Sequence, residues 1–238
     1  MINNLNVIAI IPARGGSKGV KLKNLRTVCG VPLVATVGRV IKSLAEIDRS
    51  VVSTDHEEIA RVAEDAGISA PFRRPEELSG DRVGDIEVLT HALLETELID
   101  NVTYDIIVML QPTSPLRESK HVSDAINMLV DEGWDAVWTV SETDSKSHPL
   151  KQLIVNNNRL DYYDSSGSQI IARQQLKPIY HRNGIAYIIT RECLLGKKSI
   201  KGDNTGALII KGEHVSIDTE WDLSLVEFIL SKRKGVLN

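Results

Sequence analysis

The sequence is poor in cysteine and has no long hydrophobic run. Its two cysteines, Cys29 and Cys193, are too few for a disulfide framework and lack a Cys-x-x-Cys spacing, so both are expected to be ordinary buried thiols. The first apolar run, residues 7–11, is too short for a signal peptide, and no segment approaches the length of a membrane span. These absences predict a soluble, cytoplasmic protein without a membrane partner.

The sequence also has no excess of basic residues. Twenty-eight Lys and Arg residues stand against 32 Asp and Glu residues, which gives a formal net charge of −4. A chain with this balance has no global positive field for nucleic acid, so no nucleic-acid partner is expected. Any anionic ligand must be held by a local group of Arg and Lys side chains. The length of 238 residues suits one α/β domain with a small appendage.

Short apolar runs alternate with helix-like segments through the first 140 residues. Unbroken apolar runs are typical of strands that are covered on both faces. Strands are predicted at residues 7–11, 51–53, 68–72, 105–110 and 136–140, with helices from residue 31, up to residue 67, at 85–97 and at 119–130. This rhythm predicts an α/β fold with a doubly wound, mostly parallel sheet.

The alternation stops after residue 140. Residues 141–182 are polar and loop-rich, and three asparagines at 156–158 predict a hairpin-like turn. Strands are predicted again at 184–190 and 207–210, before an amphipathic helix from about 220 to 230. The chain is therefore interpreted as a single domain over residues 1–238 with an arm inserted at about 141–182.

The loop after the first predicted strand carries the strongest local signal. It leaves the carboxyl end of that strand, where open α/β sheets bind their ligands. Its glycines let the backbone approach a ligand, and its basic side chains supply positive charge. These residues are Gly15, Gly16, Gly19, Arg14, Lys18, Lys21 and Lys23. The pattern predicts a polyphosphate site, and the alternative is a solvated basic loop.

The spacing of this loop excludes two common phosphate motifs. Gly15 and Gly16 are adjacent, which does not fit the dinucleotide-binding Gly-x-Gly-x-x-Gly pattern. No Gly-Lys-Ser/Thr sequence closes the loop, so it is not a P-loop either. A dinucleotide-dependent oxidoreductase is therefore not expected.

Several sequence blocks occur in order along nearly the whole chain. The two most specific read Ala13-Arg14-Gly15-Gly16-Ser17-Lys18-Gly19 and Leu110-Gln111-Pro112-Thr113-Ser114-Pro115-Leu116-Arg117. The others cover residues 23–24, 52–55, 74–75, 148–151, 173–175, 183–184 and 217–219. Together they resemble the acylneuraminate cytidylyltransferases, the CMP-sialic acid synthetases.

The resemblance implies a Rossmann-like nucleotidyltransferase fold with a small dimerisation arm. It implies that the anomeric hydroxyl of a nine-carbon 2-keto sugar acid attacks the α-phosphorus of CTP and that pyrophosphate leaves. Such a reaction depends on positioning and on neutralising phosphate charge. Mg²⁺ is implied as cofactor. CTP and the sugar acid are the implied partners, together with a second copy of the chain in a homodimer.

The resemblance also assigns site residues. Arg14, Lys23 and Arg173 are expected to be catalytic, because Arg chelates two phosphate oxygens and Lys supplies a point charge. The expected nucleotide-binding residues are Ala13, Arg14, Lys23, Asn24, Arg74, Val83 and Asp85. The expected substrate-binding residues are Gln111, Lys151, Arg173 and Gln174. The arm is expected to present its basic residues to the sugar, also across a dimer.

Simpler structural roles stand beside these assignments. Asn24 is alternatively a loop or helix cap, and Asp85 alternatively a helix N-cap rather than a contact of the ribose hydroxyls. Gln111 alternatively satisfies the turn that follows it. Lys18 and Lys21 are alternatively solvated. The base that takes the sugar proton is not evident, and the six histidines show no metal spacing.

Asp218 is the expected metal ligand. Magnesium is usually held by one or two carboxylates together with phosphates and water. Relatives in the resembled family often carry two aspartates here, whereas this chain has Ser216-Ile217-Asp218. Ser216 then holds a metal-bound water, or Asp222 assists from the next helical turn.

Two alternatives to N-acetylneuraminate chemistry stay open. The first is the same reaction on legionaminic or pseudaminic acid, which share the carboxylate and the attacking hydroxyl. The second is a catalytically silent, nucleotide-sugar-binding regulatory module, for which Ser216 is the one supporting feature.

Overall fold

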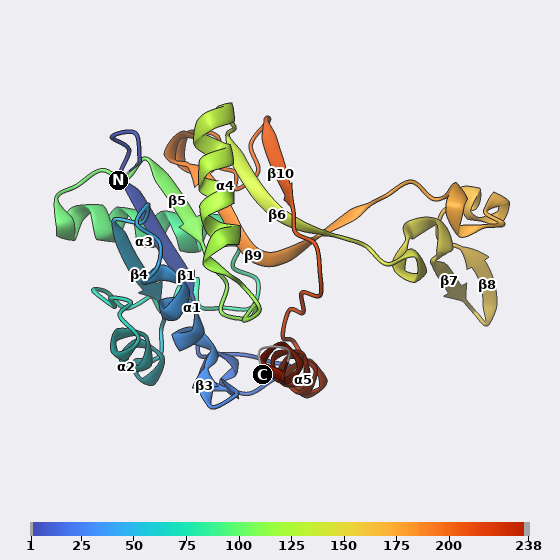
Figure 1. The fold of residues 1–238 in the computed structure, drawn as a ribbon, viewed down its shortest axis with the longest axis horizontal. Coiled ribbons are helices and arrows are strands. Elements are labelled where there is room, and N and C mark those ends of the chain that lie inside the picture. Colours follow the sequence, from blue (N-terminus) through green and yellow to red (C-terminus); the bar gives the residue numbers. More distant parts are fainter. Residues whose placement is uncertain (1, 236–238) are drawn as a thin grey trace.

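A six-stranded sheet carries the fold, and helices cover both of its faces (Figure 1). This computed structural model describes residues 2–235, so the outermost parts of the predicted 1–238 domain, residue 1 and residues 236–238, lie outside the described residues. The six strands are β1 (Val7–Pro12), β4 (Arg49–Ser53), β5 (Ile106–Met109), β6 (Ala136–Glu142), β9 (Tyr180–Thr190) and β10 (Thr205–Ile209). The two small hairpins are β2 (Thr27–Val28) with β3 (Val31–Pro32), and β7 (Leu153–Asn156) with β8 (Arg159–Tyr162).

Five α-helices accompany the sheet. They are α1 (Leu33–Ile41), α2 (Glu57–Asp65), α3 (Asp85–Asp100), α4 (Ser119–Glu132) and α5 (Glu220–Gly235). Short 3-10 turns cover Lys23–Leu25, Glu76–Leu78, Ser145–Ser147, Pro149–Lys151, Ser165–Gln169 and Arg173–Gln175, and a π-helical turn covers Glu192–Gly196.

The strand order β10-β6-β9-β5-β1-β4 confirms the predicted doubly wound, mostly parallel sheet. β1 pairs in parallel with β4 and β5, and β6 pairs in parallel with β10. β9 is antiparallel to both of its neighbours, β5 and β6. Because the chain enters β9 from the tip of the arm, it returns along β6 in the opposite direction.

The core follows the pleat of the strands. In β1, Val7, Ala9 and Ile11 pack with α1, α2 and α4 on one face, whereas Ile8 and Ile10 pack with α3 on the other. All five side chains are fully buried, which explains why this strand reads as an unbroken apolar run.

The strand predicted at residues 68–72 is wrong. The structure has only an isolated parallel bridge between Val51 and Ser69 there. Ile68 is buried, so the segment packs against the core, but Pro71 has no N–H with which to continue a ladder. The apolar pattern therefore predicted the burial of this segment correctly but not its lack of strand hydrogen bonds.

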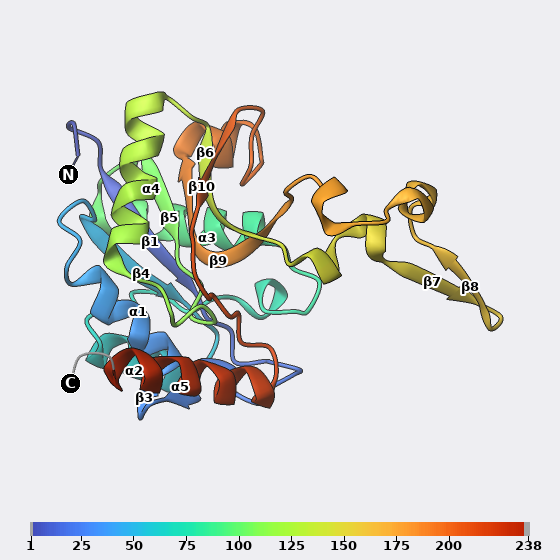
Figure 2. The ribbon, with the colours of Figure 1, turned by 45° about the vertical axis from the view of Figure 1, so that its right-hand side comes forward.

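The C-terminal helix α5 lies against one end of the molecule, near β3 (Figure 2). Leu223, Val226 and Ile229 pack on Val28 and Leu33 in a separate apolar cluster. Arg26 pairs with Glu220 at the start of α5, with a guanidinium-to-carboxylate distance of 2.7 Å. Through these contacts α5 fixes residues 215–218, which precede it, beside the loop after β1.

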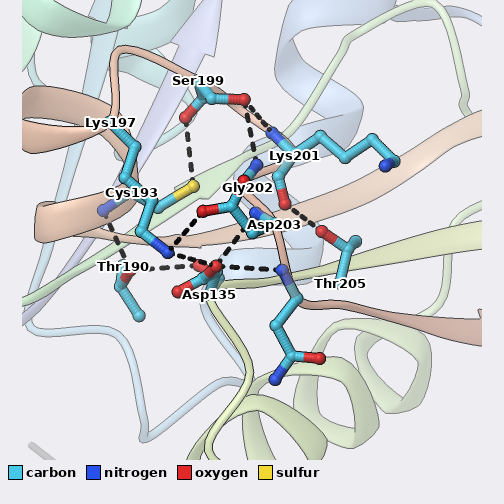
Figure 3. Close-up of polar contacts among 10 residues, drawn as sticks. Asp135, Thr190, Cys193, Lys197, Ser199, Lys201, Gly202, Asp203 and Thr205 are labelled. Atoms are coloured by element: carbon cyan, nitrogen blue, oxygen red, sulfur yellow. Dashed lines mark hydrogen bonds and ion pairs between the residues drawn. The ribbon is translucent and has the colours of Figure 1, made fainter.

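The prediction that both cysteines are buried is confirmed for Cys193 and wrong for Cys29. Cys193 is buried, and burial raises the pKa of its thiol to about 11. It belongs to a polar network around Asp135, whose carboxylate accepts from the Asn204 amide at 3.0 Å and pairs with Lys197 at 2.7 Å (Figure 3). Cys29 is exposed instead, because it occupies a left-handed position (φ 49°) in the turn between β2 and β3.

The arm projects far from the sheet in both views (Figures 1 and 2). β6 and β9 remain paired as far as Glu142 and Tyr180, so the separate part of the arm is residues 143–179. The predicted turn is confirmed: Asn157 and Asn158 have φ angles of 49° and 64° and join β7 to β8. Only His148 and Gly167 are buried within 143–179. No described helix is both long and apolar enough for a bilayer.

Removing the arm tests its independence from the core. Replacement of residues 143–179 by an Asn-Gly turn joins Glu142 to Tyr180, which are opposite each other in the ladder. Because the arm buries almost nothing, the truncated protein is expected to unfold cooperatively, with a Tm within about 5 °C of the full chain. Circular dichroism during heating measures this. A broad, non-cooperative transition would show instead that the arm is part of the core.

Candidate active site

A cleft of about 240 Å³ opens where β1, β4 and β5 end. Parallel strands present their carboxyl ends at the same edge of a sheet, which is where such folds bind ligands. The cleft is lined by Pro12, Arg14, Ser17, Lys18, Lys23, Asn24, Arg74, Leu78, Gly80, Val83, Asp85, Val88, Gln111, Pro112 and Thr113. Seven residues expected from the sequence therefore lie together: Arg14, Lys23, Asn24, Arg74, Val83, Asp85 and Gln111.

The phosphate loop, defined here as residues 13–22, is held in place by three hydrogen bonds. The Ala13 amide donates to the Ser53 carbonyl at 2.9 Å, and the Gly15 amide donates to the Asp55 carboxylate at 2.8 Å. The Asn24 side chain donates to the Arg14 carbonyl at 3.0 Å. Asn24 thus holds the loop, as the capping alternative expected, while it also lines the cleft.

Ala13 does not present its side chain to the cleft. The residue is fully buried and belongs to the apolar cluster under α1. Any contribution of Ala13 to a ligand comes from its backbone.

Lys23 joins the two ends of the chain at the cleft. Its ammonium donates to the Ile217 carbonyl at 2.9 Å and pairs with the Asp218 carboxylate at 2.8 Å. The Lys23 side chain is 15% exposed, so it is held firmly, whereas Asp218 is 75% exposed. Asp218 presents hard oxygen atoms beside the cleft cations.

The backbone approaches closely at the same place. A Cβ atom on Gly19 would collide with the Asp218 carbonyl oxygen, so only glycine allows the phosphate loop to meet residues 217–218. Ile217 is fully buried, and its amide donates to the Thr113 carbonyl at 2.8 Å. The segment before α5 is therefore fixed from both sides.

Asp222 serves the helix rather than the cleft. Its Oδ2 oxygen accepts from the amides of Asp218 and Thr219 at 3.0 and 2.7 Å and from the Thr219 hydroxyl at 2.8 Å. Burial alone would raise the pKa of Asp222, but these hydrogen bonds lower it. Ser216 is exposed. Within residues 2–235 no group of three or more His, Cys, Asp or Glu side chains could hold a metal, so protein carboxylates alone do not form a cage there.

Arg74 is a buried cation at the end of β4. Its guanidinium donates to the Ser53 hydroxyl at 3.0 Å and to the Ser53 carbonyl. Burial lowers its pKa to about 10, while the nearby carboxylates of Asp55 and Asp85 act in the opposite direction. Arg74 therefore stays charged at neutral pH.

Asp85 is the first residue of α3, and it lines the cleft. Its alternative interpretation as the helix N-cap is wrong, because Gly84 is the N-cap and no side chain caps this helix. Burial raises the pKa of the Asp85 carboxyl above its usual range, although Arg182 and Arg74 act against this shift. A partly desolvated carboxyl in a cleft of basic residues is typical of functional sites.

Gln111 is positioned by a buried arginine that sequence reasoning did not single out. Arg117 donates to the carbonyls of Gln111 at 2.6 Å and Gly184 at 3.1 Å, and also to the Ile185 carbonyl. Desolvation lowers the Arg117 pKa to about 9. Gly184, at φ 69°, lies so close that a Cβ atom there would be 2.8 Å from the Gln111 side-chain oxygen. Arg117 and Gly184 thus fix the strand end that carries Gln111.

The arm residues do not reach this cleft within one chain. Lys151, Arg173 and Gln174 are exposed on the arm. Arg173 instead lines a separate hollow at the base of the arm with Glu142, Asp144 and His148. Within one chain none of these three residues lines the cleft.

The structure adds two acidic residues to the expected set. Asp55 anchors the phosphate loop, and Asp81 pairs with Arg14 at 3.0 Å and with Lys18 at 2.5 Å. Asp55 lies in one of the blocks that carry the resemblance, so a signal existed. Asp81 comes from a loop with no periodic pattern, and only folding brings it beside Arg14, 67 positions earlier in the chain.

Comparison with known proteins identifies the chain's relatives. A family profile described as Cytidylyltransferase matches residues 8–232, which is nearly the whole chain. The chain belongs to the cytidylyltransferase family. The resemblance seen in the sequence blocks is thereby confirmed.

Three curated relatives of the family are similar over most of this chain. A "post-translational flagellin modification protein B" of Campylobacter coli is 30% identical over 95% of this chain and 96% of the relative. A "CMP-N,N'-diacetyllegionaminic acid synthase" of Legionella pneumophila is 31% identical, covering 98% and 100%. An "N-acylneuraminate cytidylyltransferase" of Escherichia coli is 30% identical over 95% of this chain but only 52% of the relative.

The fold of the family is also found among solved structures. A CMP:2-keto-3-deoxy-manno-octonic acid synthetase, solved as a complex with CTP, has a TM-score of 0.68 to this structure. The two chains are 17% identical, and the match covers 96% of this chain and 99% of the other. At this identity the likeness supports the nucleotidyltransferase fold alone, as predicted.

The raised pKa of Asp85 predicts a gain of stability on neutralisation. In the folded protein the ionised carboxylate is disfavoured, so the variant Asp85→Asn is expected to have a Tm higher by about 1 to 4 °C at pH 8. The gain should shrink as pH falls through the raised pKa, because wild-type Asp85 then takes up a proton. Heating scans from about pH 3.5, below the usual pKa of an aspartate, to pH 8 measure this.

Asp131→Asn, on the exposed end of α4, is the control for the same loss of charge. An Asp85→Asn protein that is less stable than wild type at pH 8 would show that the carboxylate is well paired.

Proposed function

We propose that this protein transfers CMP from CTP to the anomeric hydroxyl of a nine-carbon 2-keto sugar acid and releases pyrophosphate. The observation that carries the proposal is the convergence of Arg14, Lys18, Lys23 and Arg74 on one cleft, in a member of the cytidylyltransferase family. A triphosphate brings several negative charges, and this chain of net charge −4 concentrates its cations there. The proposed reaction uses CTP, and a cytoplasmic location is part of the proposal.

The proposed reaction is a single displacement. A bond forms between the anomeric oxygen and the α-phosphorus, the bond from that phosphorus to the β-phosphate oxygen breaks, and the proton of the hydroxyl passes to solvent water. Lys23 and Arg14 neutralise the phosphate charge that shifts onto the leaving pyrophosphate. Lys23 is suited to this role because its contacts with Ile217 and Asp218 fix its ammonium before the substrate arrives.

The nucleoside part of CTP is assigned to the other side of the cleft. Asp85 offers a carboxylate to the ribose hydroxyls, next to Val83 and the buried Arg74. Asn24, next to the phosphate loop, offers the cytosine edge the part of its amide that the Arg14 carbonyl leaves free. Gln111, held by Arg117, is assigned to the sugar acid.

Asp218 is the proposed protein ligand of Mg²⁺. Its exposed carboxylate lies beside the cation group, which fits a magnesium ion that takes one carboxylate together with phosphate oxygens and water. When bound, the ion would neutralise triphosphate charge and make pyrophosphate a better leaving group. Asp222 is committed to the hydrogen bonds at the start of α5, so Asp218 is assigned alone.

The sugar is proposed as a class, with N-acetylneuraminate and legionaminate as the leading candidates. Relatives named for each are about equally identical to this chain, at 30% and 31%. The legionaminic acid synthase matches over its full length, which favours legionaminate as the second candidate. Pseudaminate shares the reacting groups and completes the set.

Pyrophosphate release is the test of this function. Each of the four nucleoside triphosphates is combined with Mg²⁺ and with N-acetylneuraminate, legionaminate or pseudaminate. Release is expected with CTP and at least one sugar acid. Silence in every combination, from folded protein that still binds CTP, would favour the regulatory module instead.

Lys23→Ala is expected to lower kcat by about two orders of magnitude or more, because the ammonium neutralises transferring phosphate. Lys21→Ala is the matched control, since Lys21 is exposed and absent from the cleft lining, and it should stay close to wild type. Near wild-type turnover in Lys23→Ala would remove this residue from the mechanism.

A homodimer is proposed as the functional unit. The arm leaves apolar side chains largely exposed within one chain: Val155, Leu160 and Tyr163 are more than 60% exposed, and Ile171 is 92% exposed. Burial of such side chains favours association with a second copy. In that arrangement Lys151, Arg173 and Gln174 of one chain act on the sugar acid in the cleft of the other.

Mixing two inactive variants tests this arrangement. Arg173→Ala and Lys23→Ala are each expected to be strongly impaired. If Arg173 acts across the dimer, subunit exchange gives mixed dimers with one intact site, and about a quarter of wild-type activity should return. Each variant incubated alone is the control. An unchanged rate after proven exchange would place Arg173 outside the partner's site.

A further inference from the structure

Asp81 is the acidic partner of the two phosphate-loop cations. Its Oδ1 oxygen lies 3.0 Å from the Arg14 guanidinium, and its Oδ2 oxygen lies 2.5 Å from the Lys18 ammonium. Both cations line the cleft, whereas the Asp81 carboxylate does not. The paired cations lower the pKa of Asp81, so it is ionised at neutral pH.

Asp81 belongs to a loop, residues 79–84, with few other attachments. Arg14 also reaches the Ser79 carbonyl at 3.4 Å, and the Val83 amide reaches the Gly80 carbonyl at 3.4 Å. Both hydrogen bonds are long, and the second lies within the loop. The start of the loop is tied back to the preceding turn, because the Ser79 amide donates to the Glu76 carbonyl at 2.9 Å and the Ser79 hydroxyl donates to the Pro75 carbonyl at 3.0 Å. Neither of these bonds reaches the phosphate loop. The Asp81 ion pairs are therefore the main contacts that hold the tip of this loop on the phosphate loop.

The exposure of these groups makes the pairing replaceable. The Asp81 side chain is 42% exposed, Arg14 is 32% exposed and Lys18 is 80% exposed. Ion pairs this open to solvent shift an equilibrium by only about fivefold or less. A triphosphate carries several charges and can chelate the same guanidinium, so it outcompetes one carboxylate.

We propose that Asp81 competes with phosphate for Arg14 and Lys18. The carboxylate positions both cations before CTP binds, gives them up to the triphosphate, and returns to them as pyrophosphate leaves. Asp81 is thus a positioning residue that disfavours retention of the product anion. The inference rests on the proposed function, because it requires a triphosphate in this cleft.

A carboxylate at this place has one alternative role, that of a second ligand to the magnesium of Mg²⁺·CTP. The two roles have opposite consequences. A competing anion weakens triphosphate binding, and more strongly without metal, because the metal neutralises part of the triphosphate charge. A metal ligand strengthens binding, and only with metal.

The test compares the full-length wild type with Asp81→Asn and Asp81→Glu. Calorimetry measures the affinity for CTP, tripolyphosphate and pyrophosphate, with EDTA and with Mg²⁺. Asp81→Asn is expected to bind all three about 3- to 5-fold more tightly without metal and about 2-fold more tightly with Mg²⁺. Asp81→Glu keeps the carboxylate and should stay within about twofold of wild type.

Product inhibition provides a readout that a purely structural role would not move. Pyrophosphate is expected to inhibit turnover by Asp81→Asn about 3- to 5-fold more strongly than turnover by the wild type. Asp203→Asn is the matched control, because Asp203 forms an exposed ion pair with Lys197 and the same charge is lost. It should change neither affinity nor inhibition.

Affinities of Asp81→Asn equal to wild type would overturn the inference, and so would weaker binding in Mg²⁺, which would make Asp81 a metal ligand. If pyrophosphate release proceeds normally while Asp81→Asn changes nothing, this inference fails and the proposed function stands. If wild type binds none of the three anions and releases no pyrophosphate, both fail.

Discussion

The ammonium of Lys23 joins two segments that are 194 positions apart in the sequence. It donates to the Ile217 carbonyl and pairs with Asp218, and so closes the cleft between the phosphate loop and the start of α5. Three other features support this junction. Gly19 lacks a side chain and so lets the two segments meet, Ile217 is buried beneath them, and α5 packs on the β2/β3 hairpin.

The electrostatic design of the cleft is local rather than global. An acidic chain collects Arg14, Lys18, Lys23 and Arg74 at one edge of its sheet. Each cation has a hydrogen-bond or ion-pair partner. The partner keeps the cation in place, and a carboxylate partner also offsets part of its positive charge. The strength of each interaction depends on how deeply the two groups are buried. Arg74 is held by neutral Ser53 atoms in the interior, whereas Asp81 holds its cations at the surface, where water weakens the attraction.

The body and the arm obey different physical constraints. The body buries both faces of its sheet and needs no other chain to cover its core. The arm is a hairpin with short turns, and nearly all its residues are exposed. The exposed apolar side chains of the arm, such as Val155 and Ile171, support the proposed homodimer.

The sequence by itself determined most of the central strands and helices, the mostly parallel character of the sheet and the positions of the phosphate loop and the arm, but not the β2/β3 hairpin. Local patterns carry this information, because an unbroken apolar run such as residues 7–11 reports burial on two faces and a Gly- and Lys-rich loop reports a backbone free to meet phosphate. The sequence blocks also named seven residues that line the cleft, from Arg14 to Gln111.

Only the tertiary structure decided which of these residues have partners. Asp81 pairs with Arg14 across 67 positions of the chain, and Lys23 pairs with Asp218 across 195 positions. Arg117 contacts Gln111 six positions away, across the turn that follows β5. The pattern of apolar and polar residues along the sequence does not indicate any of these contacts. The failure of the strand at 68–72 has the same origin, since a ladder needs hydrogen bonds that Pro71 cannot supply. The composition and periodicity of the sequence therefore indicate which residues are buried, whereas the packing of the helices and strands decides which side chains are hydrogen-bonded or ion-paired.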